Sequence, residues 1–454
     1  MIIGLLLMGA VIFGFMWLQD TDESQAPQDQ AEKVEAKKPS AADVFSDSLA
    51  ATELSAAKTA VFQYGKADAE SGVKTLKSEN VELTLNGETL GGNVRVNDTT
   101  LAVATLAKAD NGPSRLLHNA AVKEVRKAVE TASRYSNFMQ FISGDSTTIK
   151  LQNDLLAIDL SNKGGVIARA TLKKYTAYSN GEQHSQAVLF DNTNNSYGFV
   201  LNSNTQRFDS GDFYFTPVQE NDSTVLMKLD FGKDVYWGIR YTLPKNSYLV
   251  KMDIVQKNMQ TVIPSNIATM DFHWSQKMAR HEMGEMFEER NSGIFYKLSG
   301  GSVDNLSETS SDEDEIEDRM KWIAFKDQFF TFAIIADKYF SGTNHFNSEV
   351  IDKDDPDHKG FMKRLNATSV IDYSSLTPNP ASFHVFLGPN EYKLLSSLDK
   401  ISPKEDLHLT QVIPLGWKLF RWINTGVIIP IFNFLGTMNL NYGIIILLLT
   451  IFIK

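Results

Sequence analysis

Hydrophobic residues in the middle of the chain recur at every second position. Apolar and mostly polar residues alternate along six stretches: 81–85, 156–160, 225–231, 237–243, 248–254 and 383–387. Alternation with this period predicts half-buried β-strands with one face in water. Many antiparallel strands in one chain predict a large β-sandwich, which we place at residues 51–405. The main helical candidate within it covers residues 116–135, with Ala120, Val125 and Val129 at its apolar positions.

The start of the chain is an almost unbroken apolar segment from Ile2 to Leu18. At about 1.5 Å rise per residue, a helix of this length crosses most of a hydrocarbon core roughly 30 Å thick. A cleaved signal peptide is the alternative, but the segment lacks a basic region before it and a small-x-small cleavage site after it. We therefore predict a transmembrane anchor at residues 1–18. The polar residues 19–50 have little to bury and predict a flexible linker.

A second apolar segment lies near the end of the chain. Residues 444–453 are continuously apolar, and Lys454 follows them. Because a helical span needs about 20 residues, residues 441–454 are interpreted as the start of a second transmembrane helix in a C-terminally truncated chain. About 1.5 Å per residue from Tyr442 at the interface puts Lys454 roughly 18 Å deep, where a cation is costly and usually functional or paired. The alternative is that Lys454 is the cytoplasmic flank of a very short span.

The segment before this apolar run has the pattern of a helix that lies in the headgroup plane. Basic and aromatic residues accompany an apolar face, and the four that carry the prediction are Trp417, Lys418, Arg421 and Trp422. We predict an interfacial amphipathic helix over residues 410–436, which Pro430 would end or kink. The alternative is an ordinary helix packed on the soluble domain.

Net charge and cysteine content exclude several classes of protein. The chain has a formal net charge of −11, whereas a protein that binds nucleic acid needs a basic face to displace counterions. We therefore expect no nucleic-acid partner. The chain has no cysteine, so disulfides, thiolate catalysis, sulfur-ligated zinc and a lipid-modified cysteine are excluded.

No catalytic motif is found in the sequence. G-x-S-x-G, H-E-x-x-H and the P-loop are missing. His281 and Glu282 lie in a stretch, 278–290, whose four Glu could supply general acids or bases. Such a stretch is more often the polar face of a helix or the edge of a loop, so we expect no enzyme, no metal site and no cofactor. The acidic runs 309–318 and 352–357 lack EF-hand ligand spacing and are expected to be solvated loops.

Several segments resemble the YidC membrane insertase family in its Gram-negative form. The stretch DRMKWIAFKDQFFTFAII has the Lys-Trp-x-x-x-Lys-x-x-Phe-Phe pattern of that family. The segments that resemble the family, in the same order along the chain, are 153–165, 318–335, 386–395, 416–424 and 441–454. Each segment alone is modestly specific, but the ordered set with its two apolar ends is specific.

The resemblance implies a mainly β fold: a large periplasmic β-supersandwich, similar to galactose mutarotases, flanked by transmembrane and interfacial helices. It implies a multi-pass protein of the bacterial inner membrane that inserts and helps fold membrane proteins, alone or with the Sec translocon. The implied partners are nascent membrane proteins, the translocon and the lipid bilayer. In the family, a basic residue late in the second transmembrane helix lies in a hydrophilic substrate groove. The Thr-x-x-x-basic pattern places Thr450 and Lys454 there, although many members have Arg.

An alternative of a different class remains open from the residues alone. A membrane-anchored, carbohydrate-binding β-sandwich of the cell envelope would have the same two apolar ends. It predicts a concave face on the sandwich that is rich in Trp, Tyr and carboxylates.

Overall fold

The computed structural model describes most of the chain beyond residue 133. It describes residues 134–453 except 180, 181, 205, 283, 417 and 439, together with the strand residues 63–64, 73–78, 81–86, 92–96 and 99–103. The predicted anchor, the predicted linker, Trp417, Lys454 and nearly all of the predicted helix over 116–135 lie outside the described residues.

The first strands along the chain form a small antiparallel sheet of their own. Its strands are β1 (Gln63–Tyr64), β2 (Val73–Ser78), β3 (Val81–Asn86), β4 (Gly92–Val96) and β5 (Thr99–Val103). They follow one another in sequence order, so each strand pairs with the next one along the chain. This arrangement is a β-meander.

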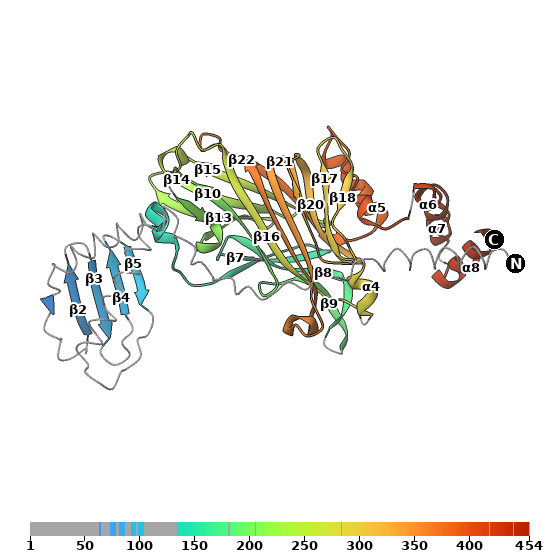
Figure 1. The fold of residues 1–454 in the computed structure, drawn as a ribbon, viewed down its shortest axis with the longest axis horizontal. Coiled ribbons are helices and arrows are strands. Elements are labelled where there is room, and N and C mark those ends of the chain that lie inside the picture. The colour runs from blue at the N-terminus through green and yellow to red at the C-terminus, as the bar shows by residue number, and fades with distance from the viewer. Residues whose placement is uncertain are drawn as a thin grey trace, which may run out of the picture. The chain divides into compact units, whose positions relative to one another are not determined.

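Two further antiparallel sheets form a large sandwich (Figure 1). The smaller has four strands in sequence order: β6 (Thr148–Gln152), β7 (Leu156–Ser161), β8 (Val166–Ser179) and β9 (Glu182–Phe190). Gly164 and Gly165 form the turn from β7 to β8 at φ angles of 79° and 66°, a left-handed conformation that favours glycine. The Gly-Gly turn expected from the sequence is therefore present.

The larger sheet has fourteen strands. Its main path runs β11-β10-β16-β22-β21-β23-β15-β14-β13-β12, with β17 to β20 attached through β21. The bounds are β10 (Asn195–Asn202), β11 (Arg207–Asp209), β12 (Thr216–Asn221), β13 (Thr224–Gly232), β14 (Val235–Thr242), β15 (Leu249–Lys257), β16 (Thr269–Ala279), β17 (Gly293–Leu298), β18 (Val303–Asn305), β19 (Asp312–Ile316), β20 (Met320–Lys326), β21 (Phe330–Val350), β22 (Phe361–Asp372) and β23 (Ala381–Pro389).

The alternation of the sequence matches the alternation of burial. In β7 every second side chain is buried, and β16 follows the same rule along most of its length. The buried side chains of both sheets, such as Ile158 of β7 and Trp274 of β16, belong to one hydrophobic core. The prediction of a mainly β fold with a large antiparallel sandwich is confirmed.

Of the two acidic runs, the second is a solvent-facing turn as expected, and the first is not a loop throughout. Within the first, Asp312–Ile316 forms β19, which pairs with β21 and keeps its carboxylates in solvent. A loop was the wrong expectation there, because strand pairing uses only the backbone and tolerates charged side chains in water. In the second run, Asp355 and Asp357 each accept a hydrogen bond of 2.8 Å from Nη2 of Arg364.

Helices are short and few in the described sandwich. The α-helices are α4 (Glu285–Glu289) and α5 (Tyr392–Ser397), and the 3-10 helices are η1 (Ser136–Phe141), η2 (Ser210–Asp212), η3 (Met259–Thr261), η4 (Pro356–Lys359), η5 (Leu398–Ile401) and η6 (Leu409–Val412). The C-terminal helices are α6 (Lys418–Ile423), the π-helical η7 (Asn424–Ile428), α7 (Ile429–Gly436) and α8 (Tyr442–Ile453).

The segment predicted as an interfacial helix is continuous across Pro430 but not regular. The widened π turn of η7 directly precedes α7, and Pro430 occupies the second position of α7. Proline has no N–H, and its ring would collide with the carbonyl of Gly426, four residues earlier, in a regular α-helix. The π turn relieves that collision, so Pro430 changes the helix locally without ending it. Within the part of the chain that the structure describes, no helix has both the length and the apolarity to cross a bilayer.

Candidate functional site

Of the two residues predicted for the substrate groove, the structure describes Thr450, which lies near the end of α8. Thr450 is exposed, and its hydroxyl donates a 2.7 Å hydrogen bond to the carbonyl of Ile446 one turn earlier. This bond occupies the hydroxyl within its own helix. Lys454 lies outside the described residues, so its role in a groove stays a prediction.

The residues predicted for the interfacial helix are described in part. Arg421 is half-buried and Trp422 is 66% exposed, both on α6. Lys418 begins α6. Trp417 lies outside the described residues. The contact of this helix with headgroups stays a prediction.

The C-terminal helices carry an unusual amount of exposed apolar surface. The exposed large apolar side chains are Phe420, Trp422, Phe434, Met438, Tyr442, Ile444, Ile446, Leu447, Leu448, Ile451, Phe452 and Ile453. In α8 only Ile445 and Leu449 are buried. A contiguous apolar surface of this kind marks a contact with lipid or with another protein.

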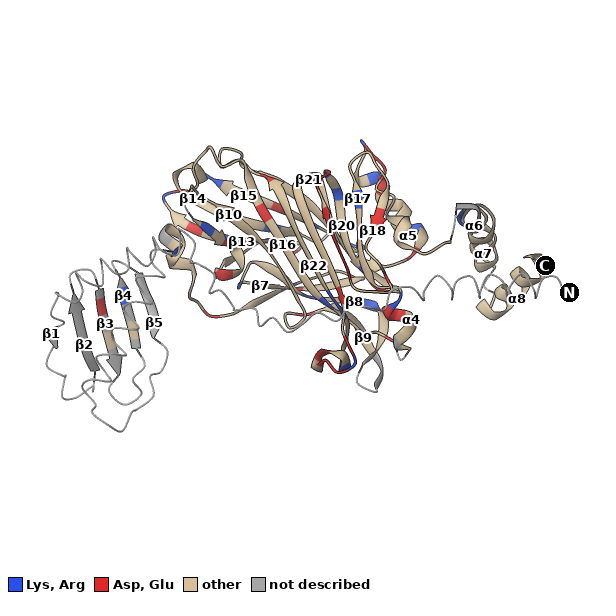
Figure 2. Cartoon of the chain, in the orientation of Figure 1, with Lys and Arg blue, Asp and Glu red and all other residues tan. Residues whose placement is uncertain are grey.

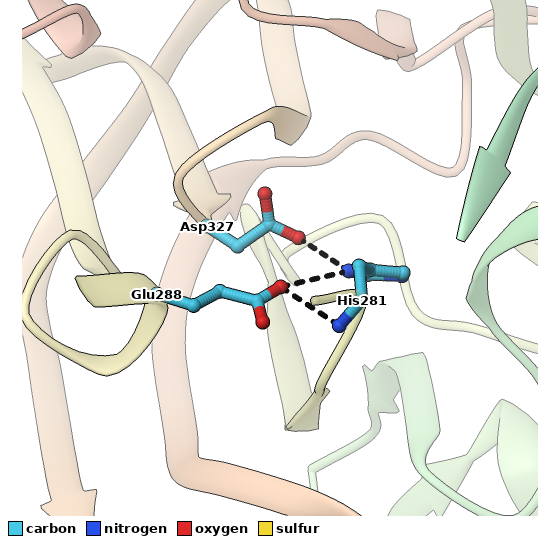
Figure 3. A group of neighbouring side chains, drawn as sticks. All are labelled: His281, Glu288 and Asp327. Carbon is cyan, nitrogen blue, oxygen red and sulfur yellow. Dashed lines mark hydrogen bonds and ion pairs between the residues drawn. The ribbon is translucent and has the colours of Figure 1, made fainter. Parts of the chain in front are cut away.

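A buried ionic cluster, which we call the triad, is the most distinctive polar site in the described sandwich (Figure 3). His281 follows β16, Glu288 lies on α4, and Asp327 follows β20. Nδ1 of His281 is 2.9 Å from Oδ2 of Asp327 and 3.4 Å from Oε1 of Glu288. Their side chains are 5% exposed for His281, 0% for Glu288 and 2% for Asp327.

Backbone donors hold the Glu288 carboxylate in place. The backbone N–H of His281 donates to Oε1 at 2.8 Å, and the backbone N–H of Glu282 donates to Oε2 at 3.0 Å. The helix α4 is therefore tied to the end of β16 through its own buried side chain. Burial of a carboxylate is costly unless such donors and a cation compensate it.

Asp327 is held in the same way from the other side. The backbone N–H groups of Phe329 and Phe330 donate to Oδ1 of Asp327 at 2.7 and 2.6 Å. These two bonds close the turn between β20 and β21, which leaves Oδ2 for His281. Both carboxylates of the triad thus order a local backbone segment and face the imidazole.

The imidazole of His281 is a cation in this setting. Burial alone would lower the pKa of His281, but the hydrogen bond and charge of Asp327, then Glu288 and the carbonyl of Val188, raise the pKa to about 10. Nε2 lies 2.9 Å from the Val188 carbonyl, whereas Nδ1 faces the two carboxylates at ion-pair distance. The ligand atoms of the triad lie within 4.8 Å of one another, which also suits a metal ion. The positive charge of the protonated imidazole compensates the same carboxylates, those of Glu288 and Asp327, that a metal ion would bind.

The interpretation of 278–290 as a polar face or loop edge is wrong for two of its residues. Glu282 is exposed as expected, whereas His281 and Glu288 are buried. Sequence spacing could not indicate this, because Asp327 comes from a distant segment. The only available signal was that Asp327 lies inside the Lys-Trp-x-x-x-Lys-x-x-Phe-Phe stretch.

That stretch also anchors the segment that leads to the C-terminal helices. Nε1 of Trp322, fully buried on β20, donates a 2.7 Å hydrogen bond to the carbonyl of Leu407. Lys326 is buried and pairs with Oε1 of Glu308 at 2.7 Å. Trp322 and Lys326 are four residues apart on β20, so both contacts lie on the same face of the strand.

A hollow lined in part by His281 lies against the four-stranded sheet. Its volume is about 780 Å³. Its charged lining residues are Lys150, Asp159, Arg169, Lys173, Asp191 and Arg280, and its aromatic ones are Tyr178, Phe190 and Phe361. The described lining contains no Trp and more cations than carboxylates. This composition does not fit the concave, Trp-rich and carboxylate-rich face that a carbohydrate-binding sandwich predicts.

Comparison with known families identifies the class of protein. Residues 148–429 match the model of the YidC periplasmic domain. The match covers more than half of the chain, so this chain belongs to the YidC family, which is a family of membrane protein insertases and not of enzymes. The matched region is therefore a periplasmic domain.

Curated relatives agree with this family. The chain is 35% identical over 329 residues to the membrane protein insertase YidC of Azobacteroides pseudotrichonymphae, covering 72% of this chain and 52% of that one. It is 36% identical over 313 residues to the insertase of Parabacteroides distasonis, covering 68% and 48%. The insertase of Porphyromonas gingivalis is 28% identical over 456 residues, covering 100% and 61%. The chain thus spans about half the length of the first two relatives.

Solved structures similar to the sandwich include mutarotase-related proteins. A galactose mutarotase-like protein from Lactobacillus casei is 8% identical, with a TM-score of 0.31, and the similarity covers 54% of this chain and 100% of that one. This likeness is too low to decide anything about the fold, which is defined here by its own strand order.

Proposed function

We propose that this chain belongs to a protein that inserts integral membrane proteins into the bacterial inner membrane and helps them fold. It acts alone or beside the Sec translocon, as a multi-pass protein with its large domain in the periplasm. The match of residues 148–429 to the periplasmic domain of the family carries the proposal. The names of the relatives, which are membrane protein insertases, support it.

The proposed mechanism is the shielding of hydrophilic segments as they enter lipid. A polar group without partners is costly in hydrocarbon, so a wet groove that contains a cation lowers the barrier for a polar segment. In this proposal Thr450 and Lys454 belong to that groove. The exposed apolar side chains of α8 support its contact with lipid or with neighbouring helices. The exposed Trp422 and the half-buried Arg421 on α6 support its place among headgroups.

Reconstitution tests the proposal directly. The complete product of the gene is placed in liposomes, and a single-span substrate with a short translocated tail is synthesised in their presence. We expect the substrate tail to become protected from protease only in liposomes that contain the protein. Equal protection in empty liposomes, or no protection in either, contradicts the proposal.

A further inference from the structure

Three large apolar side chains at one end of the sandwich are exposed to solvent. Met286 and Phe287 on α4 are 61% and 71% exposed, and Phe329 in the turn between β20 and β21 is 37% exposed. We call these three residues the apolar tip. Elsewhere in the described sandwich, the large apolar side chains that are exposed to this degree are Val218 and Leu376. All the other exposed large apolar side chains belong to α6, α7, α8 and the turn after α7.

The triad fixes the two halves of the apolar tip to each other. Glu288 directly follows Phe287 on α4, and Asp327 lies two residues before Phe329. Both carboxylates meet the imidazole of His281. A buried cation between two carboxylates thus holds the exposed helix and the exposed turn in one rigid arrangement.

The apolar tip lies beside the segment through which the chain leaves the sandwich. The backbone N–H of Asn390 donates to the carbonyl of Phe329 at 2.7 Å, and Nδ2 of Asn390 donates to the carbonyl of Asp327 at 3.0 Å. Helix α5 begins two residues after Asn390 and packs against η6. Figure 1 shows α4 and α5 at the same end of the sandwich.

The length of the connection keeps this end close to α6. Six residue steps separate Val412, the last residue of η6, from Lys418, the first residue of α6. A fully extended chain covers at most about 3.6 Å per step, so the connection spans at most about 22 Å. The buried Trp322, which donates to the carbonyl of Leu407, fixes the start of this connection on β20. The apolar tip and the exit of the chain are therefore attached to the same strand.

We propose that the apolar tip is a lipid-docking surface. It rests on the periplasmic leaflet of the same membrane in which α6 lies. The proposal rests on the proposed function in one respect, namely that α6 lies in the headgroup layer. Burial of Met286 and Phe287 among acyl chains supplies the attraction, as it does for interfacial amphipathic segments. The sandwich is thereby held at a fixed height and orientation above the bilayer.

The charged residues near the apolar tip determine which lipid headgroups it can dock on. Glu282 and Glu391 are exposed and line the same hollow as Phe329. These two carboxylates outnumber Arg290, the exposed cation that caps α4, so the attraction comes from apolar burial and not from electrostatics. Docking should persist on zwitterionic phosphatidylethanolamine and phosphatidylcholine, and it should not strengthen when anionic lipid is added.

The 454 residues contain no cysteine, so a single cysteine introduced among them can be labelled specifically once any cysteine elsewhere in the complete protein has been replaced by serine. Met286→Cys and Phe287→Cys variants of the complete protein are labelled with an environment-sensitive fluorophore and reconstituted into zwitterionic vesicles that contain nitroxide-bearing lipid. Leu376→Cys, an exposed apolar position that is also in the sandwich, is the matched control. Trp422→Cys reports the position of α6. All four positions are exposed, so the substitutions leave the core intact.

We expect roughly two-fold quenching at positions 286 and 287, because interfacial side chains enter the boundary of headgroups and acyl chains, and little at position 376. Quenching at 422 without quenching at 286 and 287 overturns the docking surface and leaves the proposed function standing. A spectral shift at 287 without quenching indicates a protein partner and also overturns it. Equal quenching at 376 overturns it as non-specific. No quenching at 422 contradicts the membrane placement of α6 itself, and with it this inference.

Discussion

Nδ1 of His281 lies 2.9 Å from Oδ2 of Asp327, and this ion pair joins two strands that are not neighbours in the large sheet. The histidine follows β16 and the aspartate follows β20. Nearly all of both side chains is buried, so neither charge can turn to water when its partner is removed. The pair is therefore a structural requirement for the segments that it connects.

Replacement of His281 by alanine should destabilise the sandwich strongly. The change leaves the carboxylates of Glu288 and Asp327 buried without a cation, and breaking a buried pair in this way typically costs about 3–5 kcal/mol. Thermal or denaturant unfolding of the purified protein measures the loss. His384→Ala is the matched control, because His384 pairs with Asp337 at the same 2.9 Å but in a half-exposed setting. That control should cost less than about 1 kcal/mol. Equal losses would contradict the role of burial.

The stability supplied by His281 should disappear at high pH. The pKa of His281 is about 10 in the folded protein and 6.5 as the ordinary value, so the folded state holds the proton more tightly. The stabilisation is then fully present below pH 6.5 and is lost as the pH rises through about 10. We expect the difference in unfolding midpoint between the wild type and His281→Ala to shrink steadily from pH 6 to pH 10.

Lys363 also titrates in this pH range and therefore contributes to the pH dependence of stability. Burial lowers the pKa of Lys363 to about 8, with the sign of its effect opposite to that of His281. Lys363 is present in both proteins, so its contribution cancels in the difference between them. A difference that is independent of pH would mean that His281 does not carry the proton.

Trp322→Phe should loosen the segment that leads to the C-terminal helices. The variant keeps most of the apolar volume but removes the donor to the Leu407 carbonyl, which is then left buried without that bond. Such a loss costs about 1–3 kcal/mol. Limited proteolysis should show faster cleavage within 402–416 than in the wild type.

Trp237→Phe separates the hydrogen bond from the loss of volume. Trp237 is also fully buried, but its Nε1 has no hydrogen-bond partner in the described part of the chain. The two variants lose similar volume, so only Trp322→Phe should expose the segment to protease. Cleavage that is equal in both variants would assign the effect to packing alone.

Lys454→Ala in the complete protein should weaken the insertion of substrates with charged translocated regions. The proposed groove then lacks the cation that lowers the cost of a polar segment in lipid. Initial insertion rates in reconstituted vesicles measure the effect, with a substrate whose translocated region is uncharged as the control. Lys454→Arg should retain the wild-type rate, because the charge is kept. Unchanged rates for Lys454→Ala would exclude this role for Lys454.

The strands could be predicted from the sequence because alternation is a local property. In each half-buried strand the alternation of apolar and polar residues matches the alternation of burial, as in β7 and β16. The order of fourteen strands in the large sheet could not be predicted in the same way, since β15 pairs with β23 and β16 pairs with β22 across long intervening segments. The π turn before Pro430 was also beyond prediction, because Pro430 is compatible with an end, a kink or a widened turn.

The burial of the triad could not be predicted from the local sequence. Glu282 and Glu288 lie in the same acidic stretch, yet the first is exposed and the second is buried. What separates them is the imidazole of His281 and the turn at Asp327, neither of which is evident from local composition. Figure 2 shows that charged residues of both signs are spread over the strands and loops of the sandwich.

The contacts of β19 give the domain an electrical consequence. The backbone N–H of Ser307 donates to Oδ2 of Asp312, the first residue of β19, at 2.7 Å. Glu308, next to Ser307, pairs with Lys326, which directly precedes Asp327. The acidic strand is thereby linked to the turn that carries Phe329. Its exposed carboxylates add negative charge on this side of the sandwich, and physiological salt confines the field of such charges to about 8 Å.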